Sequence, residues 1–266
     1  MVTSNLKDRL DEKLHAQASA PQQPGQISDN VIDMPTTALT TAGSEFLALT
    51  NDALDIINEN LRNQPLSYQL FDVIKAPSGG ITSFSVPGLS GDEMEKEISG
   101  IILGYSTPRA YWSTTEPIEG QAPDCYSSDS MVSHDGKQCS RCLYNEFGSK
   151  ANGDSNGKAC KESVSVFLLR PDNIMPIIVR IPVSSKVMFQ RYMTRLIGNM
   201  IPLYGVVTRF SLTKATNKTG QPYATYNFEV VRKLSPEETA SAKVFGQKFT
   251  DALDAADIEP ELAEAV

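Results

Sequence analysis

The sequence lacks any long apolar run, and this absence limits the class of protein first. No stretch approaches the roughly 18 uninterrupted apolar residues that a membrane-spanning helix requires, so we expect no membrane partner. Residues 1–9 alternate charged and polar side chains and do not form the apolar core of a secretory signal, so export is not expected. We therefore predict a cytoplasmic protein whose cysteines are kept reduced.

The side chains and motifs of common catalytic sites are also scarce. His15 and His134 are the only histidines in 266 residues. The sequence contains no G-x-S-x-G nucleophile elbow, no Walker phosphate loop and no G-x-G-x-x-G. The zinc-deaminase pattern fails because His134 is followed by Asp135-Gly136 and no Pro-Cys-x-x-Cys is present. We predict that the protein is not an enzyme.

The net charge of −8, taken for the whole chain, argues against a nucleic-acid partner, but the charge is unevenly distributed. Residues 1–100 hold 6 basic and 14 acidic side chains, residues 101–236 hold 16 and 10, and residues 237–266 hold 2 and 8. A basic middle segment can bind a polyanion although acidic ends make the chain negative. The sequence therefore allows a polyanion site in the middle region.

Three regions are expected along the chain. Residues 1–44 start with a charged segment compatible with a helix and continue through Pro-, Gln- and Thr-rich sequence, which predicts a flexible N-terminal arm. Residues 45–236 carry the strand and helix patterns of a folded domain. Residues 237–266 are interpreted as an acidic C-terminal tail.

Two interpretations of the acidic end remain open. Phe245, Phe249 and Leu253 fall at a spacing of four, which favours a short amphipathic helix packed on the core. Residues 249–266 contain six acidic and no basic side chains, which favours a tail that docks on partner proteins and competes with a polyanion for basic surface.

Apolar periodicity in the middle region predicts a mainly β fold. The order is strand, insertion, strand, strand, helix, strand, strand, which fits a five-stranded OB barrel with its helix between the third and fourth strands. A generic antiparallel sheet with one packed helix remains the alternative. Strands are expected over 82–86, 97–105, 109–113, 164–170, 175–181, 204–212 and 222–230, and helices over 45–62 and over 184–200, the latter with Ser184 as N-cap and Met188, Tyr192, Leu196 and Met200 on one stripe.

All four cysteines lie in the insertion, residues 115–162, which is rich in Gly, Ser, Asp and Asn: Cys125, Cys139, Cys142 and Cys160. Their C-x13-C-x2-C-x17-C spacing is typical of four thiolates around one Zn²⁺, and a closed tetrahedron indicates a structural rather than catalytic ion. Two disulfides and four inert thiols are the alternatives, but the first needs an oxidising compartment and the second an apolar core. His134 is an alternative ligand in place of one cysteine.

The basic middle also carries the side chains that bind single-stranded nucleic acids, namely cations and aromatic rings. In an OB barrel the first and fourth inter-strand loops border the binding face, and the insertion occupies the first. The alternatives are a solvated surface for each lysine and the core for Tyr111 and Trp112. The candidate contacts are Arg109, Tyr111, Trp112, Arg141, Lys150, Lys158, Lys161, Arg209, Lys214, Lys218 and Tyr223.

An ordered set of short motifs resembles the zinc-containing single-stranded-DNA-binding proteins of bacteriophages and mobile elements. The resemblance covers about residues 65–235, although Leu143 stands where proline often follows the close cysteine pair. The motifs are Arg109-Ala110-Tyr111-Trp112, Pro123-Asp124-Cys125, Cys139-Ser140-Arg141-Cys142, Phe147-Gly148-Ser149, Gly157-Lys158-Ala159-Cys160-Lys161 and Pro182-Val183-Ser184-Ser185.

The resemblance implies a protein that coats single-stranded DNA, without sequence preference, during phage replication or recombination. It implies an OB-like core and four zinc-ligating cysteines, and it places the protein in the cytoplasm of a bacterial host. Replication or recombination proteins are the expected partners of the acidic tail. A zinc-ribbon module that regulates a phage or host polymerase is the alternative function, and a structural protein of the virion is a third.

Overall fold

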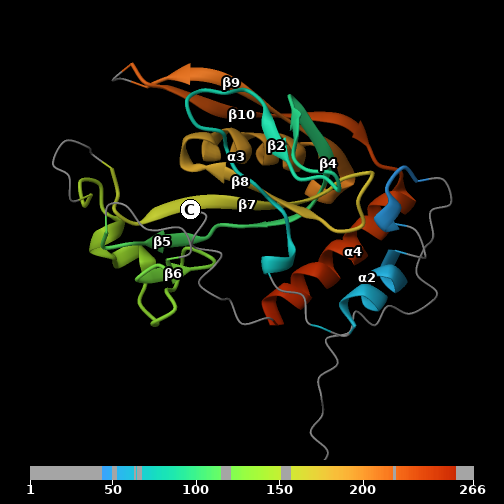
Figure 1. Ribbon diagram of the computed structural model, residues 1–266, viewed down its shortest axis with the longest axis horizontal. Coiled ribbons are helices and arrows are strands. Elements are labelled where there is room, and N and C mark those ends of the chain that lie inside the picture. Colours follow the sequence, from blue (N-terminus) through green and yellow to red (C-terminus); the bar gives the residue numbers. More distant parts are fainter. Residues whose placement is uncertain are drawn as a thin grey trace, which may run out of the picture. The chain divides into compact units, whose positions relative to one another are not determined.

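The computed structural model describes most of the middle region and the beginning of the predicted tail (Figure 1). The predicted arm, apart from Ser44, lies outside the described residues, as do residues 256–266 and Lys218. No helix of the described part is long and apolar enough to cross a membrane. The described ranges are 44–49, 53–62, 64, 68–114, 121–150, 157–217 and 220–255.

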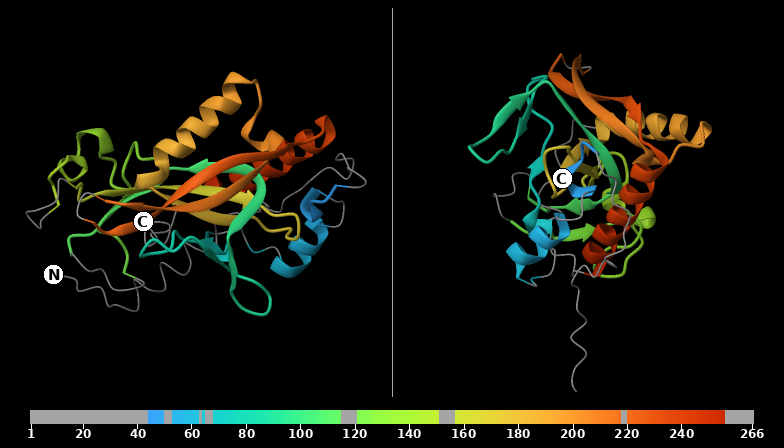
Figure 2. Two further views of the ribbon diagram at one scale, coloured as in Figure 1. Left: turned by 90° about the horizontal axis from the view of Figure 1, so that it is seen from above. Right: turned by 90° about the vertical axis from the view of Figure 1, so that its right-hand side faces the viewer.

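The fold is mainly β, as predicted, and is built around one curled sheet that forms a half-barrel (Figures 1 and 2). Its hydrogen-bonded order is β1-β8-β7-β4-β9-β10, in which only the β1–β8 pair is parallel. The six strands are β1 (Val73–Ile74), β4 (Glu97–Ser106), β7 (Lys161–Leu169), β8 (Ile177–Pro182), β9 (Val206–Thr216) and β10 (Pro222–Lys233).

Helices cover both faces of this sheet. Phe189, Tyr192 and Leu196 of α3 (Val183–Gly198) pack into one apolar cluster, whereas Phe245 and Phe249 of α4 (Pro236–Ala255) pack into another together with α2 (Ala53–Leu61). Because both faces are covered, β7 and β8 are almost continuously buried from Ser163 to Leu169 and from Ile177 to Ile181. The remaining elements outside the cysteine-rich region are β2 (Phe84–Val86), β3 (Glu93–Glu95), η1 (Leu47–Leu49), η2 (Tyr68–Leu70) and η5 (Leu203–Gly205).

A glycine and two bulges accompany the curl of the sheet. At Gly100 of β4, an added Cβ would lie 2.3 Å from the carbonyl oxygen of Leu169, so only glycine fits where β7 crosses β4. The register shifts between Ile102 and Gly104 in the β4–β7 ladder and between Val230 and Arg232 in the β9–β10 ladder. Such bulges bend a strand and increase its twist.

The half-barrel is not closed by a ladder between β8 and β10 among the described residues. The fully buried Tyr226 of β10 links these elements instead. Its N–H donates to Oγ of Ser185 in α3 (3.0 Å), and its Oη donates to the carbonyl of Arg180 in β8 (3.0 Å). Burial raises the pKa of Tyr226, so the hydroxyl stays a neutral donor.

Several predicted elements need correction. The helix expected over 45–62 is divided into η1 and α2, and the strand expected over 109–113 ends at Tyr111. Pro182, not Ser184, occupies the N-cap of α3, and no side chain caps it. The predicted stripe of α3 was partly wrong: Tyr192 and Leu196 are buried with Ser185 and Phe189, whereas Met188 is 38% and Met200 93% exposed.

The boundary of the acidic tail was placed too early. Residues 236–255 form α4, whose Phe245 and Phe249 are buried, which supports the packed-helix interpretation of this part. The helix begins at a capping box in which Glu238 N–H donates to Ser235 Oγ (3.1 Å) and Ser235 N–H donates to Glu238 Oε2 (2.9 Å). Only residues 256–266 remain for a tail, and they lie outside the described residues.

Candidate metal centre

The four cysteines lie in a small subdomain inserted between β4 and β7, which we call the cysteine-rich subdomain (residues 107–162). Its strand β5 pairs with both β6 and the beginning of β7, with Ala110 opposite Lys161. Its apolar cluster contains little more than Ala110 and Trp112, with Tyr126 packed against them. The elements are β5 (Arg109–Tyr111), β6 (Cys125–Ser127), η3 (Cys139–Arg141) and η4 (Leu143–Asn145).

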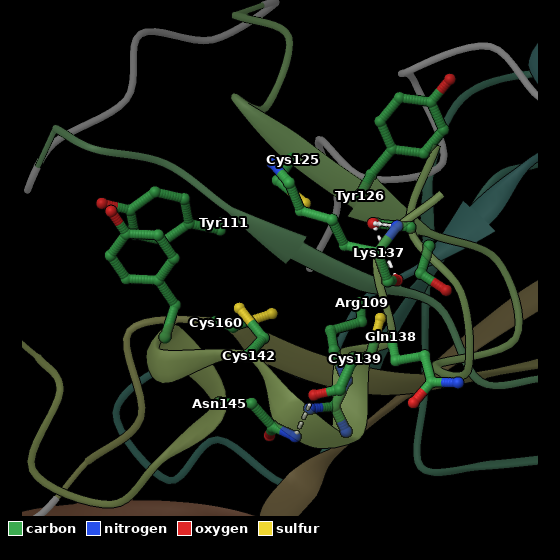
Figure 3. Close-up of a pocket in the computed structure, with 13 residues that line it drawn as sticks. Arg109, Tyr111, Cys125, Tyr126, Lys137, Gln138, Cys139, Cys142, Asn145 and Cys160 are labelled. Atoms are coloured by element: carbon green, nitrogen blue, oxygen red, sulfur yellow. Dashed lines mark hydrogen bonds between the residues drawn. The ribbon is translucent and has the colours of Figure 1, made fainter. Parts of the chain in front are cut away.

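All four cysteine side chains line one pocket of this subdomain (Figure 3). Cys125 begins β6, Cys139 and Cys142 lie on either side of a tight η3 turn, and Cys160 directly precedes β7. Backbone hydrogen bonds fix the turn: Cys142 N–H donates to the carbonyl of Cys139 (3.3 Å), and Cys160 N–H donates to that of Tyr144 (2.8 Å). All four are free thiols, so the alternative of two disulfides is not seen.

The environment of the pocket disfavours thiolates that have no cation beside them. Burial, followed by the neighbouring cysteines, raises the pKa of Cys160 to about 12, although the Arg109 charge acts in the opposite direction. Burial, Asp135 and two other cysteines likewise raise the pKa of Cys125. A divalent cation between the sulfurs would remove the repulsion among them, because metal binding deprotonates thiols.

A second group of potential ligands shares Cys125. The ligand atoms of Cys125, His134 and Asp135 all lie within 4.8 Å of one another. His134 stacks on Tyr126, with ring centroids 4.6 Å apart, and accepts the Tyr126 N–H at Nδ1 (3.4 Å). Asp135 is already bound by Lys137 (2.5 Å), whose hydrogen bond is the main reason that its pKa falls to about 2. Among the described residues the donors that lie this close together are therefore Cys125, His134 and Asp135, whereas the four cysteine sulfurs line the same pocket without forming such a group.

Arg109 was predicted to contact DNA, but its side chain is only 9% exposed. Its Nη2 donates to Glu162 Oε2 (2.9 Å) and its Nε to Ser130 Oγ (3.2 Å). Glu162 is also paired with Lys186 of α3. Nη1 of Arg109 is buried without a hydrogen-bond partner, and the residue lines the cysteine pocket. This position argues against a DNA contact and for a role inside the subdomain.

Tyr111, the last residue of β5, and Trp112, which follows it, are also largely unavailable. Trp112 is buried, and its Nε1–H donates to the carbonyl of Gln121 (3.0 Å). Tyr111 lies in the pocket lining with one ring face stacked on Tyr144, at a centroid distance of 3.9 Å and an interplanar angle of 13°. The buried environment raises the pKa of Tyr111, and the Tyr144 hydroxyl raises it further.

The remaining candidates form two groups on different elements. On the sheet, Arg209 lies between Glu97 (3.3 Å) and Glu229 (4.0 Å), whereas Lys214 and Tyr223 are exposed on the β9–β10 hairpin. On the cysteine-rich subdomain, Lys161 lies 5.9 Å from the centre of the Trp112 ring. Arg141 and Lys150 are exposed there, and Lys158 is partly exposed.

Sequence reasoning missed two exposed aromatic residues of the subdomain. Phe147 is 80% exposed and Tyr144 46% exposed. The available signal was their position in a Gly-, Ser- and Asn-rich segment, where no apolar periodicity assigns an aromatic ring to a core. Such rings are candidates for a binding surface.

A scan against protein-family models finds no match to this chain, and searches of curated proteins and of solved structures find none either. The resemblance to zinc-containing single-stranded-DNA-binding proteins therefore stays a prediction. The function has to be argued from the geometry of the chain itself.

Proposed function

We propose that the protein binds single-stranded DNA and that one structural Zn²⁺ holds its cysteine-rich subdomain together. The observation that carries the proposal is that four free cysteines, from three separate segments, line one pocket of a subdomain whose described residues hold almost no apolar core. Four thiolates are a common ligand set of structural zinc. A zinc ion bound there would supply the cross-link that apolar packing supplies elsewhere in the chain.

Arg109 supports this assignment by its charge. Zn²⁺ with four thiolates carries a net charge of −2, and such a buried group needs compensating donors. Nη1 of Arg109 is buried and unpartnered in the pocket lining. Glu162 and Ser130 hold the rest of the guanidinium in place. In this proposal Arg109 balances thiolate charge and does not bind DNA.

The order of the strands supports an OB-like domain. Counted from β4, the sequence β8-β7-β4-β9-β10 corresponds to strands 3-2-1-4-5, the arrangement of an OB barrel, and α3 lies between the third and fourth strands. The cysteine-rich subdomain then occupies the first inter-strand loop, and the β9–β10 turn is the fourth. These loops border the nucleic-acid face of OB domains. Here Arg141 and Lys150 are exposed in the first, and Lys214 is exposed in β9, next to the fourth.

Titration of the zinc-loaded protein with labelled oligo(dT), with a duplex of equal length as control, tests the proposal. We expect a preference for the single strand and a slope of log affinity against log salt steeper than about −2, because each neutralised phosphate contributes about −0.7. Equal affinity for duplex, or a flat salt response, would contradict it.

The second candidate function is a zinc-ribbon module that docks on a phage or host polymerase. Exposed aliphatic side chains of the subdomain favour it, since Leu143 is 72% and Met131 68% exposed. Salt-insensitive binding to one purified polymerase, without affinity for oligo(dT), would select this alternative.

A further inference from the structure

Phe147 is the most exposed aromatic side chain in the described part of the chain, at 80%. It follows η4, only five residues after Cys142. Burial of a phenylalanine side chain is favourable by about 1.5–3 kcal/mol relative to its exposure to water. An exposed ring on a binding protein therefore indicates a surface that is covered when the ligand is bound.

The turn that carries Phe147 is held by several hydrogen bonds. Gly148, at a φ of +86°, reverses the chain directly after the ring, and its N–H donates to the carbonyl of Gly157 (3.1 Å). Ser149 Oγ donates to the carbonyl of Glu146 (2.7 Å) and accepts the N–H of Ala159 (2.9 Å). The two segments are thus tied together, so little order would have to be gained when a ligand binds.

A lysine stands against this ring. Nζ of Lys158 lies 4.7 Å from the centre of Phe147 and donates to Oδ1 of Asn145 (3.0 Å). No carboxylate pairs with Lys158 among the described residues. Over the described segments 139–150 and 157–161 there are four basic side chains and one acidic side chain, Glu146. The ring therefore lies in a surface with an excess of positive charge.

We propose that Phe147 and Lys158 form a stacking subsite for one base of single-stranded DNA, an inference that rests on the proposed function. The Phe147 ring stacks on the base, and the Lys158 ammonium pairs with the adjacent phosphate. A base and its phosphate combine an apolar face with a negative charge, which matches this pair of side chains. An apolar protein surface fits less well, because covering Phe147 would also desolvate the Lys158 charge.

Replacement of the ring in the zinc-loaded full-length protein tests the subsite. We expect Phe147→Ala to weaken oligo(dT) binding roughly 5- to 150-fold, the range that corresponds to loss of one stacked base. Phe147→Tyr should retain most of the affinity because it keeps the ring. Leu143→Ala is the matched control: Leu143 is 72% exposed on the same segment but has no ring, so its loss should change affinity less than twofold.

Phe147→Trp provides a direct signal, since stacking on a base quenches indole fluorescence, and Lys158→Gln should make the salt slope shallower by about 0.7. Zinc content and thermal unfolding of each variant check the fold. If the wild-type protein binds oligo(dT) but Phe147→Ala binds equally well, or Leu143→Ala is as weak as Phe147→Ala, the subsite is wrong and the proposed function stands. If the wild-type protein does not bind oligo(dT), both are wrong.

Discussion

The half-barrel and the cysteine-rich subdomain are stabilised in different ways. Apolar clusters line both faces of the sheet, with fully buried side chains such as Phe210 and Ile102 on one face and Ile101 on the other. Among the described residues of the subdomain, the apolar cluster buries only Ala110 and Trp112. Burial of apolar area is the main favourable term in folding. The comparison shows that the half-barrel can fold by burial, whereas the subdomain needs another source of stability.

Polar contacts provide part of the stability of the subdomain. The Asp129 carboxylate accepts the N–H of Met131 (2.7 Å) and the hydroxyl of Ser127 (2.9 Å), and its pKa is lowered because these and the Val132 N–H stabilise its charge despite burial. Net contributions of such hydrogen bonds are small, about 1 kcal/mol each. In our proposal the larger part comes from the metal.

Removal of the metal should have the largest effect on the difference in stability between the subdomain and the half-barrel. We expect purified protein to contain about one zinc ion per chain, and chelation to unfold the subdomain while the half-barrel persists, because structural zinc contributes about 10–16 kcal/mol in small zinc domains. Limited proteolysis should then produce cuts within residues 107–162 that the zinc-loaded protein does not show. Cys142→Ser should behave like the chelated protein, and Ser140→Ala, between the paired cysteines, like the wild type. A zinc content near zero, with freely titrating thiols, would contradict the metal site.

Arg109→Met tests the link between the two regions. The change removes the buried partner of Glu162, and breaking a buried pair costs about 3–5 kcal/mol. Because Lys186 still pairs with Glu162, we expect the free energy of unfolding to fall by an amount near the lower end of this range. Urea unfolding measures the change. Arg109→Lys should restore part of the lost stability. Weakened DNA binding at unchanged stability would show instead that Arg109 contacts DNA.

Gly100→Ala should destabilise the half-barrel and leave the subdomain intact. The added methyl group would meet the carbonyl oxygen of Leu169 at 2.3 Å, and overpacking of this kind costs about 1–3 kcal/mol. Thermal unfolding measures the loss, and unchanged zinc content shows that it is confined to the sheet. Gly198→Ala is the control, since nothing lies within 4 Å of its added methyl group. Equal unfolding temperatures of the two variants would contradict the close approach.

Glu238→Gln should reduce stability in a pH-dependent way. The Arg232 guanidinium, together with the Ser235 N–H, lowers the pKa of Glu238 from 4.5 to about 2. Its carboxylate therefore stabilises the fold above pH 4.5, and this contribution is lost as the pH falls toward 2. We expect a deficit of about 1–2 kcal/mol at pH 7 that shrinks in urea titrations at lower pH. Glu237→Gln, at the exposed neighbouring position, should show no such trend.

Deletion of residues 256–266 should have the smallest effect on stability. The proposed tail carries no basic residue, so as a tethered competitor it would occupy the basic surface until DNA displaces it. We expect the truncated protein to bind oligo(dT) more tightly at low salt, with a gain that shrinks as salt screens the attraction, and to lose any replication partner in pull-downs. If DNA affinity is unchanged at every salt concentration and the pull-downs are intact, the tail neither competes with DNA nor binds partners, and it serves only to keep the protein in solution.

The sequence predicts the sheet better than it predicts the surface. Segments rich in Val, Ile and Leu give β7 and β8 close to their observed positions, because burial on both faces requires apolar side chains. The four cysteines line one pocket, as their spacing led us to expect, whereas the zinc ion itself stays a prediction. A packed helix was one of two open interpretations of the acidic end, and the capping-box sequence Ser235-Pro236-Glu237-Glu238, which marks where α4 begins, was not used to choose between them.

The burial of Arg109 was not predicted, and that of Trp112 was left as an alternative, for a different reason. Alternation along a short strand separates its two faces but does not reveal what covers each of them. Glu162 and Ser130 bind Arg109, and Gln121 binds Trp112, from segments that are distant in sequence or separated by a loop. No local pattern encodes such contacts, so charge and aromaticity alone suggested a DNA surface.

The cysteine-rich subdomain leaves and re-enters the half-barrel through a narrow stem. At its base Ser163 N–H donates to the carbonyl of Pro108 (3.1 Å), and Arg109 pairs with Glu162 across the strands. Closing a loop at a fixed stem costs little more when the loop is longer, about 0.6 kcal/mol for each doubling of its length. The cysteine-rich subdomain should therefore be replaceable. If a short hairpin or a larger domain is inserted in its place, β4 and β7 should stay paired as they are.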